Sequence, residues 1–347
     1  MKVDYIIVGC GLASIAFCEE LISNKKSFVV FDDQSQQSSV VAAGLYNPVI
    51  LKRFSEVWKA KEQLKTALPF YHQLEVKLQA KLDHKFAIYR RFASIEEQNL
   101  WFEAADNPKL DPYLSTKIVN NTNASVNAPY GFGEVLQAGR IDTNTLITSY
   151  KTYLSNEGKL IASRFQHDNL LFEAEGVQYD NIEASGIVFA EGFGLKKNPF
   201  FKDLPLNGTK GEVVTIKASN LKLDKALKSG VFIIPIGNDL YKVGATYNWD
   251  DKTNLPTEEG KSELIEKLKT FILCDFEVVD QKAGIRPTVK DRRPLVGRHY
   301  EHKNLYVLNG LGTRGVMIAP YIAPQLYNYI EHNASLEAEI DIKRFTS

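Results

Sequence analysis

The chain is poor in cysteine and has no long apolar run, no internal repeat and no net charge. Only Cys10, Cys18 and Cys274 occur, and their spacing matches neither a C-x-x-C motif nor a metal site. This argues against a disulfide framework and fits a reducing compartment, so we expect a cytoplasmic protein. No apolar run is long enough to span a bilayer. The chain enters its first strand almost at once, so we also expect no signal peptide.

The charge balance is neutral, with 42 basic and 42 acidic residues among 347. No global field therefore attracts nucleic acid or anionic lipid, although a local basic cluster is compatible with this balance. The six histidines have no metal-ligand spacing, which predicts packing or surface roles for them and no metal site. The length indicates two domains, and 44% apolar residues is ordinary for a globular protein.

What is present begins at the N-terminus with a strand, a glycine turn, a helix, a second strand and an acid. Tyr5 to Val8 is an apolar run typical of a buried parallel strand. Gly9 permits a tight turn, Gly11 allows the backbone close to a pyrophosphate, and the following helix directs its N-terminus at that charge. Asp32 lies where an acid binds adenosine ribose hydroxyls. The pattern predicts FAD or NAD, with an ordinary βαβ unit as the alternative.

Ser14 stands where this fingerprint has its third glycine. That glycine serves close packing of the helix on the strand, so a small residue is tolerated. We expect the Ser14 hydroxyl to hydrogen-bond back to the preceding turn.

The rest of the chain interleaves nucleotide-type segments with antiparallel ones. Helices are predicted from Ser55 to about Leu82, over 95–105 and after an Asp142 N-cap, with a strand over 84–92. Three antiparallel strands are predicted between 211 and 249. The expected domains are therefore discontinuous: 1–84, 141–207 and 283–347 for the nucleotide, and 85–140 and 208–282 for the substrate.

Several motifs along the chain resemble the D-amino-acid oxidase (DAO) superfamily of FAD-dependent flavoproteins. They are IIVGCGLAS, FVVFDD, SSVVAAGL, IVFAEGFG, KGEVV, LYKVGATY, AGIRPTVKDRRPLVG and NLYVLNGLGTRGVMIAP. Two branches are most similar: glycine oxidase, and the oxidase half of the bifunctional enzyme that makes 5-methylaminomethyl-2-thiouridine in tRNA. The resemblance implies an α/β fold, with an FAD-binding Rossmann-like domain on a parallel sheet and a substrate domain on a mixed or antiparallel sheet.

The resemblance also selects FAD, bound non-covalently, over NAD. The residues implied in cofactor binding are Gly9, Gly11, Leu12, Ala13, Asp32, Asp33, Ala43, Gly44, Ala190, Gly192, Gly310, Gly312, Thr313, Arg314, Gly315 and Val316. The glycines of the 310–316 loop would let backbone N–H groups approach the flavin, where the following helix adds the positive end of its dipole.

The implied catalytic residues are Arg286, Arg314, Phe232 and Tyr247. Arg286 matches the glycine oxidase arginine that binds the substrate carboxylate in two parallel hydrogen bonds, with a structural ion pair as the alternative. Arg314 fits the pattern of the tRNA enzyme, and its role stays open between site and structure. Phe232 replaces a carboxylate-binding tyrosine, which favours a bulkier or more apolar substrate than glycine.

Two tyrosines, Tyr247 and Tyr46, are candidates to replace the hydroxyl that Phe232 lacks. Arg292 and Arg293 are expected at the solvated surface. Cys10, inside the glycine turn, is expected to be inert filler.

The predicted function is an FAD-dependent oxidoreductase that transfers hydride from the C–H next to nitrogen in a small amine or amino acid. The resulting imine would hydrolyse. The alternative is a tRNA-modifying flavoenzyme that removes a carboxymethyl group from a wobble uridine, which would need a basic rim at the site. A third possibility is a non-catalytic FAD protein, against which the intact Arg286 and glycine loop argue. The sequence does not indicate an oligomeric state.

Overall fold

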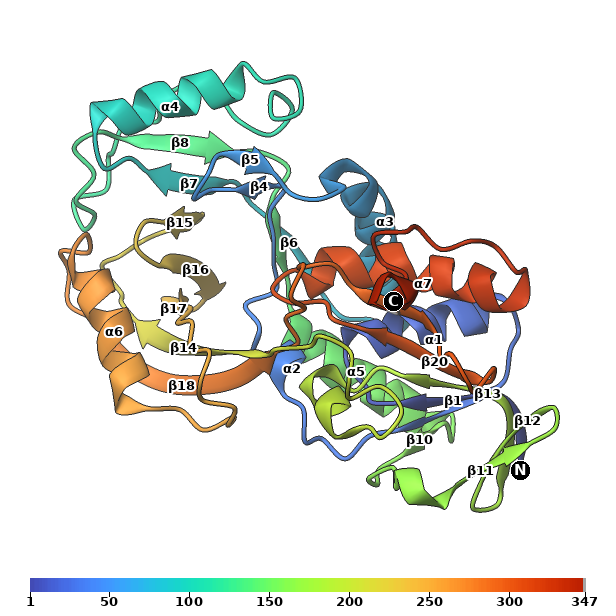
Figure 1. The fold of residues 1–347 in the computed structure, drawn as a ribbon. Coiled ribbons are helices and arrows are strands. Elements are labelled where there is room, and N and C mark those ends of the chain that lie inside the picture. Colours follow the sequence, from blue (N-terminus) through green and yellow to red (C-terminus); the bar gives the residue numbers. More distant parts are fainter. Residues whose placement is uncertain (346–347) are drawn as a thin grey trace.

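The computed structural model describes residues 1–345, which form two lobes, each built on one large β-sheet (Figure 1). One sheet is largely parallel and the other largely antiparallel. This confirms the predicted mixed α/β class.

The first sheet is a nucleotide-type sheet with a buried parallel core. The helices α1 (Leu12–Ser23), α7 (Gly315–Glu331) and α3 (Ala60–Leu78) cover one face together with α5 (Thr143–Asn156). Phe31, Phe165 and Phe189 belong to the hydrophobic core on the other face. Parallel strands buried on both faces read as unbroken apolar runs, which is why Tyr5–Val8 could be recognised. Its strands, in spatial order, are β10 (Leu160–Ile161), β2 (Phe28–Phe31), β1 (Lys2–Val8), β13 (Ile182–Phe189), β12 (Gly176–Tyr179) and β11 (Leu170–Glu173), with β20 (Leu305–Asn309) pairing β13 and β19 (Leu295–Arg298).

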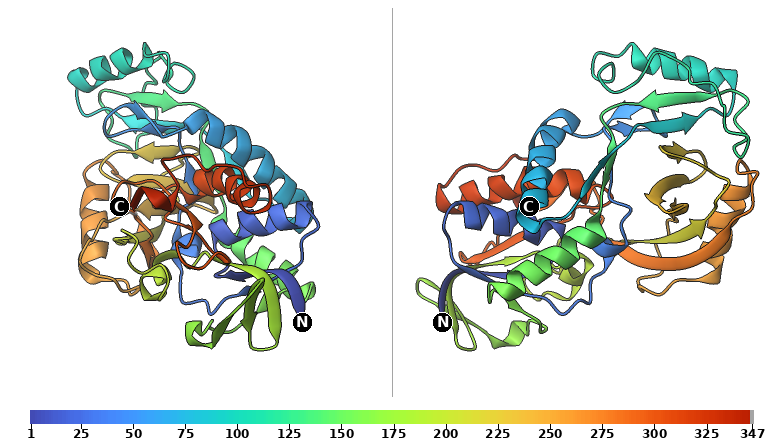
Figure 2. Two further views of the ribbon diagram at one scale, coloured as in Figure 1. Left: turned by 45° about the vertical axis from the view of Figure 1, so that its right-hand side comes forward. Right: turned by 180° about the vertical axis from the view of Figure 1, so that it is seen from behind.

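The second sheet has seven strands, and two helices, α6 (Glu258–Lys269) and α4 (Ile95–Ala105), lie at its outside (Figure 2). The order is β18 (Glu277–Arg286), β14 (Thr209–Lys217), β17 (Leu240–Gly244), β16 (Phe232–Gly237), β15 (Ala226–Lys228), β7 (Ile88–Arg91) and β8 (Phe132–Val135). The antiparallel pairing of β14, β17 and β16 confirms the three predicted strands.

The remaining elements are short. They are α2 (Ser38–Val41), the sheet of β3 (Leu45–Tyr46), β9 (Gly139–Ile141) and β6 (Asp83–Lys85), the pair β4 (Val49–Ile50) and β5 (Ser55–Glu56), and the 3₁₀ turns η1 (His167–Asn169), η2 (Gly192–Lys197) and η3 (Ile342–Phe345).

Local signals placed two helices correctly and misplaced two boundaries. Helix α4 spans the predicted residues, and the Asp142 side chain caps α5 by accepting a hydrogen bond from the backbone N–H of Thr145. The helix predicted from Ser55 begins only at Ala60, because Ser55 and Glu56 pair with β4. The strand predicted over 84–92 is divided, since β6 pairs with β9 and β7 with β8.

Among residues 1–345 no helix is long and apolar enough to cross a membrane. The two large sheets take their strands alternately along the chain, and the domain boundaries given above remain our proposal for dividing it.

Candidate active site

One cavity of about 1080 Å³ is lined from both lobes. Every residue predicted for cofactor binding or catalysis lines it, from Gly9 in the first turn to Val316 in the last helix. Its volume suits a ligand at the upper end of small-molecule size. Segments far apart in the sequence therefore meet at one place.

The turn between β1 and α1 is built for close approach of its backbone. Gly9 has φ +95°, and a Cβ there would lie 2.6 Å from the carbonyl oxygen of Ala190, so a larger residue is excluded. Gly11 is the N-cap of α1, which has no side-chain cap and no acidic residue in its first turn. The first N–H groups of the helix are thus left for an anionic ligand in the cavity.

Asp32 follows β2 at the edge of this cavity and has a partner that the sequence did not indicate. Its carboxylate lies 2.6 Å from Nζ of Lys151 on α5, and its side chain is 13% exposed. One ion pair leaves other acceptor positions on the carboxylate, so the ion pair is compatible with the predicted ribose contact.

The expectation for Ser14 is wrong in one respect. Its side chain is buried, as close helix packing requires, but its hydroxyl has no hydrogen-bond partner within the described residues. Cys10 is buried, and burial raises the pKa of its thiol to about 12, which makes the thiol inert at neutral pH.

The glycine loop before α7 meets the segment that carries Arg286. Gly310 has φ +75°, and a Cβ there would lie 2.5 Å from Cγ2 of Val289. The N–H of Gly312 donates to the carbonyl of Pro287, 3.1 Å away. This hydrogen bond joins the two motifs on which the predicted chemistry rests, AGIRPTV and NGLGTRGV.

Arg286 lies at the end of β18 with its guanidinium over Gly211 of the neighbouring strand. It donates to the carbonyl of Thr246 at 3.2 and 3.3 Å, and its guanidinium lies 4.5 Å from the centroid of the Tyr247 ring. Within residues 1–345 it forms no ion pair, so the alternative of a structural salt bridge is not supported. Burial lowers its pKa, which is the signature of a cation without an anionic neighbour.

Arg314 is a second guanidinium of the same kind. It precedes α7, donates to the carbonyl of Asn47 at 2.9 Å, and forms no ion pair in the described part of the chain. Burial lowers its pKa to about 10, and the Tyr247 phenol opposes this shift. The same phenol acts on Arg286, so Tyr247 lies near both cations, with 61% of its surface exposed.

Only one of the two tyrosine candidates lies at the cavity. Tyr247 lines the cavity, whereas Tyr46 is buried in β3 outside it. The Tyr46 hydroxyl donates to the Asp83 carboxylate at 2.8 Å, because β3 and β6 flank β9 in one small sheet. Tyr46 is therefore a packing residue, and Tyr247 is the candidate that remains.

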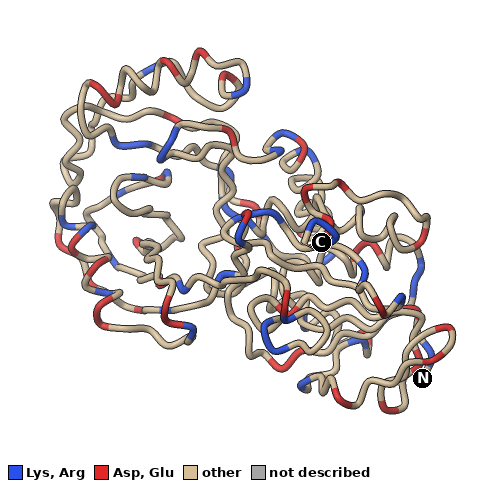
Figure 3. The backbone as a smooth tube through the Cα atoms, viewed as in Figure 1, with Lys and Arg blue, Asp and Glu red and all other residues tan. Residues whose placement is uncertain are grey.

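The lining carries an excess of positive charge that the neutral composition concealed. Basic and acidic residues are mixed over both lobes (Figure 3), yet eleven basic and four acidic residues line the cavity. Arg292 is exposed as expected, but Arg293 is half-buried, because it pairs with Glu339 at 3.1 Å and lies 4.9 Å from the Trp58 ring centroid. The lining also includes Lys228, Lys242 and Trp249, which are not among the predicted site residues.

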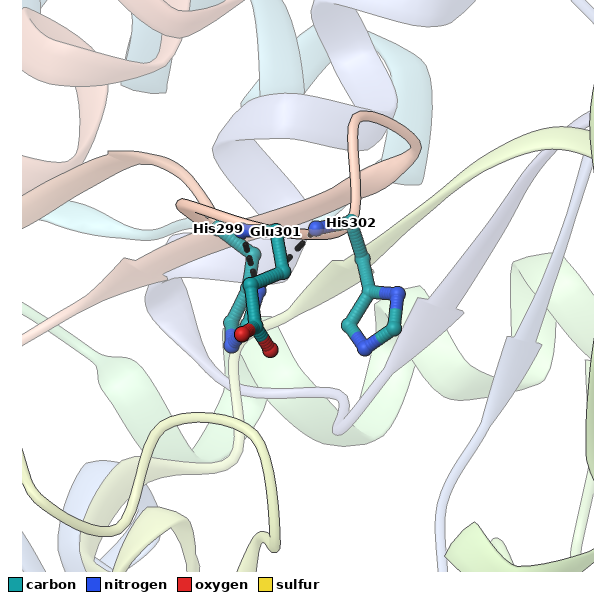
Figure 4. Close-up of side chains that lie close together, drawn as sticks. All are labelled: His299, Glu301 and His302. Atoms are coloured by element: carbon teal, nitrogen blue, oxygen red, sulfur yellow. Dashed lines mark hydrogen bonds between the residues drawn. The ribbon is translucent and has the colours of Figure 1, made fainter.

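One cluster of possible metal ligands lies outside the cavity. His299, Glu301 and His302 lie on one loop with their ligand atoms within 4.8 Å of one another (Figure 4). Nδ1 of His299 accepts hydrogen bonds from the backbone N–H groups of Glu301 and His302, at 3.1 and 3.2 Å. The neutral ring then carries its proton on Nε2, which leaves no free lone pair for a metal. The cluster is best explained as loop packing.

The geometry defines a dinucleotide-binding oxidoreductase: a glycine turn at a helix N-terminus at one end of the cavity, and unpaired arginines beside a glycine loop at the other. The chain belongs to the DAO family of FAD-dependent oxidoreductases, whose sequence profile matches residues 4–326. FAD is its cofactor, and the close backbone approach at Gly9 and Gly310 fits that group.

Individual relatives point in the same direction. Glycine oxidase of Bacillus subtilis (strain 168) is 29% identical over 55% of this chain and 56% of its own length. A bifunctional tRNA 5-methylaminomethyl-2-thiouridine biosynthesis protein of Campylobacter jejuni is 22% identical over 85% of this chain and 46% of its own length. The matches thus span about half the length of these two relatives. The crystal structure of Geobacillus kaustophilus glycine oxidase superposes with a TM-score of 0.79 at 18% identity, covering 99% of this chain and 98% of that one.

Proposed function

We propose that this chain oxidises a small amine or amino acid at the C–H bond next to nitrogen. The observation that carries the proposal is the pair of partly buried, unpaired guanidinium groups, Arg286 and Arg314, at one cavity with the 310–316 loop. Burying a cation without an anion is costly, so such a pair is best explained by an anionic ligand. A carboxylate is the anion that a guanidinium binds in two parallel hydrogen bonds.

In this proposal Arg286 holds the substrate carboxylate. The hydrogen bonds from its guanidinium to the Thr246 carbonyl fix the orientation of that group. Tyr247 lies against the guanidinium and limits water at the cavity mouth. FAD, held by the 9–13 turn and the 310–316 loop, would supply the two-electron acceptor for the hydride that leaves this carbon. The substrate nitrogen loses a proton, and water adds to the imine to give a carbonyl compound and an amine.

The test is anaerobic reduction of the FAD-loaded protein. Glycine, N-alkylglycines and a panel of amino acids are mixed with the enzyme, and loss of the yellow flavin absorbance is followed. We expect at least one amine to bleach the flavin, and Arg286→Met to slow this reaction at least about 30-fold, since an unpaired substrate carboxylate costs about 2–5 kcal/mol. If no member of the panel bleaches wild-type enzyme, the proposal is wrong.

A second candidate is the removal of a carboxymethyl group from a tRNA wobble uridine. The observation in its favour is the exposed basic side chains among the cavity-lining residues, which include Lys52, Arg53 and Arg292. Gel-shift with tRNA and nucleoside analysis of a deletion strain test it. Accumulation of a carboxymethylated uridine in the deletion strain would favour this candidate over a small-molecule substrate.

A further inference from the structure

The cavity face of the seven-stranded sheet carries cations and no anion. Arg286, Lys242 and Lys228 point into the cavity from β18, β17 and β15, and none of the cavity-lining residues that β14 to β18 contribute is acidic. The remaining lining residues of these strands are small or apolar. One substrate carboxylate bound at Arg286 and Arg314 would leave the positive charge of Lys228, at the far side of this face, without a counter-ion.

The Lys228 ammonium has only weak partners in the structure. It pairs across the hairpin with Phe232, its Nζ lies 4.9 Å from that ring centroid, and its hydrogen bond to the Gly230 carbonyl is long, at 3.4 Å. Within the described residues it forms no ion pair.

The two charged neighbours of Lys228 are cations, and each has an acidic partner of its own. Arg90 is paired with Glu97, and Lys267 with Glu263. Burial, together with Arg90 and Lys267, lowers the pKa of Lys228 to about 8. Lys228 is thus charged at neutral pH but without a counter-ion.

The strand register sets the distance between Lys228 and Arg286. The Arg286 guanidinium lies over Gly211 on β14, and Val213, two residues on, pairs with Gly244, which pairs with Phe232 beneath Lys228. Two strand spacings of about 4.8 Å and one two-residue step of about 6.8 Å, taken at right angles, place Gly211 about 12 Å from Phe232. The Arg286 guanidinium and the Lys228 ammonium lie over these two residues. A hydrogen bond of about 2.8 Å at each end leaves roughly 6 Å between two bound anionic groups.

We propose that Lys228 forms a second anion subsite, so that the substrate is an amino acid or N-substituted glycine with a second carboxylate two to four carbons from its nitrogen. This inference rests on the proposed function. It modifies the expectation drawn from Phe232. The ring supplies no hydroxyl, but it supports an ammonium group that favours a longer and more acidic substrate over a more apolar one.

The kinetic test compares N-(carboxyalkyl)glycines with N-alkylglycines of equal chain length, which have no stereocentre. Lys228→Met should lower kcat/KM for the dicarboxylates by about 10–100-fold, the range for losing a hydrogen bond to a charged group, and leave the monocarboxylates within about two-fold. Lys228→Arg should retain most of the preference. Lys225→Met removes an equal charge from a residue paired with Asp224 outside the cavity, and should change neither series. An equal loss in both series after Lys228→Met would overturn the subsite.

A binding test separates this inference from the proposed reaction. Glutarate and butyrate cannot be oxidised as amines, and their dissociation constants follow from the absorbance shift of bound FAD. Glutarate should bind more tightly than butyrate, and the difference should vanish in Lys228→Met.

The difference should also fade as pH rises through about 8, because Lys228 then loses its proton while both ligands keep their charge. If amines are oxidised but glutarate has no Lys228-dependent advantage, the subsite is wrong and the reaction stands. If the advantage is present but no amine is oxidised, the reaction is wrong and the subsite stands.

Discussion

Gly211→Ala is a perturbation that should move Arg286 without changing any charged group. Gly211 lies in β14 with an ordinary extended backbone, so alanine is tolerated there conformationally. A Cβ at this position would lie 1.9 Å from Nη2 of Arg286 and 2.2 Å from its Cζ. The nearest atoms belong to the end of a flexible side chain, so the guanidinium should give way rather than the strand.

The size of the effect follows from that overlap. Nonbonded contact needs about 3.5 Å, so the guanidinium must shift by about 1.5 Å. A misplacement of about 1 Å at a positioning group costs about 100-fold in rate. We expect kcat/KM for a carboxylate-bearing amine to fall about 100-fold, equivalent to about 2.7 kcal/mol.

The assay is steady-state kinetics with FAD content and melting temperature measured in parallel, both of which should stay near wild type. Lys217→Ala, an exposed change on the same strand, is the control. In an Arg286→Met background, Gly211→Ala should add little further loss, because both changes act through one group. Full additivity, or wild-type activity of a folded Gly211→Ala variant, would refute the role given to Arg286.

Three further outcomes are expected from contacts in the nucleotide lobe and the cavity mouth. Asp32→Asn should raise the FAD dissociation constant about ten-fold in a fluorescence titration of apoprotein, since a charge-assisted contact is worth about 1.5–3 kcal/mol; a larger effect of Lys151→Met would contradict the direct role of Asp32. Ser14→Ala should raise the melting temperature by about 1–3 °C, because it removes an unpartnered buried hydroxyl; a lower melting temperature would show that the hydroxyl is satisfied. Lys210, fully buried and paired with Asp251, anchors the loop that carries Tyr247; Lys210→Met should cost about 3 kcal/mol in urea unfolding, and an unchanged midpoint would exclude this anchor.

The features that sequence could predict are those encoded locally. The first turn was recognisable because strand, glycines, helix and acid follow one another within 32 residues, and each has its own physical requirement. Arg286 and the loop around Gly310 could be singled out only through the resemblance of their motifs. The hydrogen bond from Gly312 to Pro287 joins the segments that follow β20 and β18, two strands that belong to different sheets.

The features that could not be predicted depend on pairing between distant segments. Lys151 reaches Asp32 only because α5 lies beside β2 in the fold. Tyr46 donates its hydroxyl hydrogen bond to Asp83, and not to a ligand in the cavity, because β3 and β6 flank the same strand. Lys228 has no motif around it. Its orientation follows from the register of the β15–β16 hairpin, which places it beside Phe232, and from the cavity that this face closes.

The position of the basic residues, rather than their number, favours a small anionic substrate over a nucleic acid. Net charge was the first argument against nucleic acid, yet it says nothing of the eleven basic residues that line one cavity. A nucleic acid backbone binds cations that extend into solvent and release counter-ions. Arg286, Arg314, Lys242 and Lys228 are instead partly buried, where a cation gains most from a ligand that is itself removed from water. A small dianion can enter and neutralise them there, whereas a phosphate backbone would stay at the exposed rim.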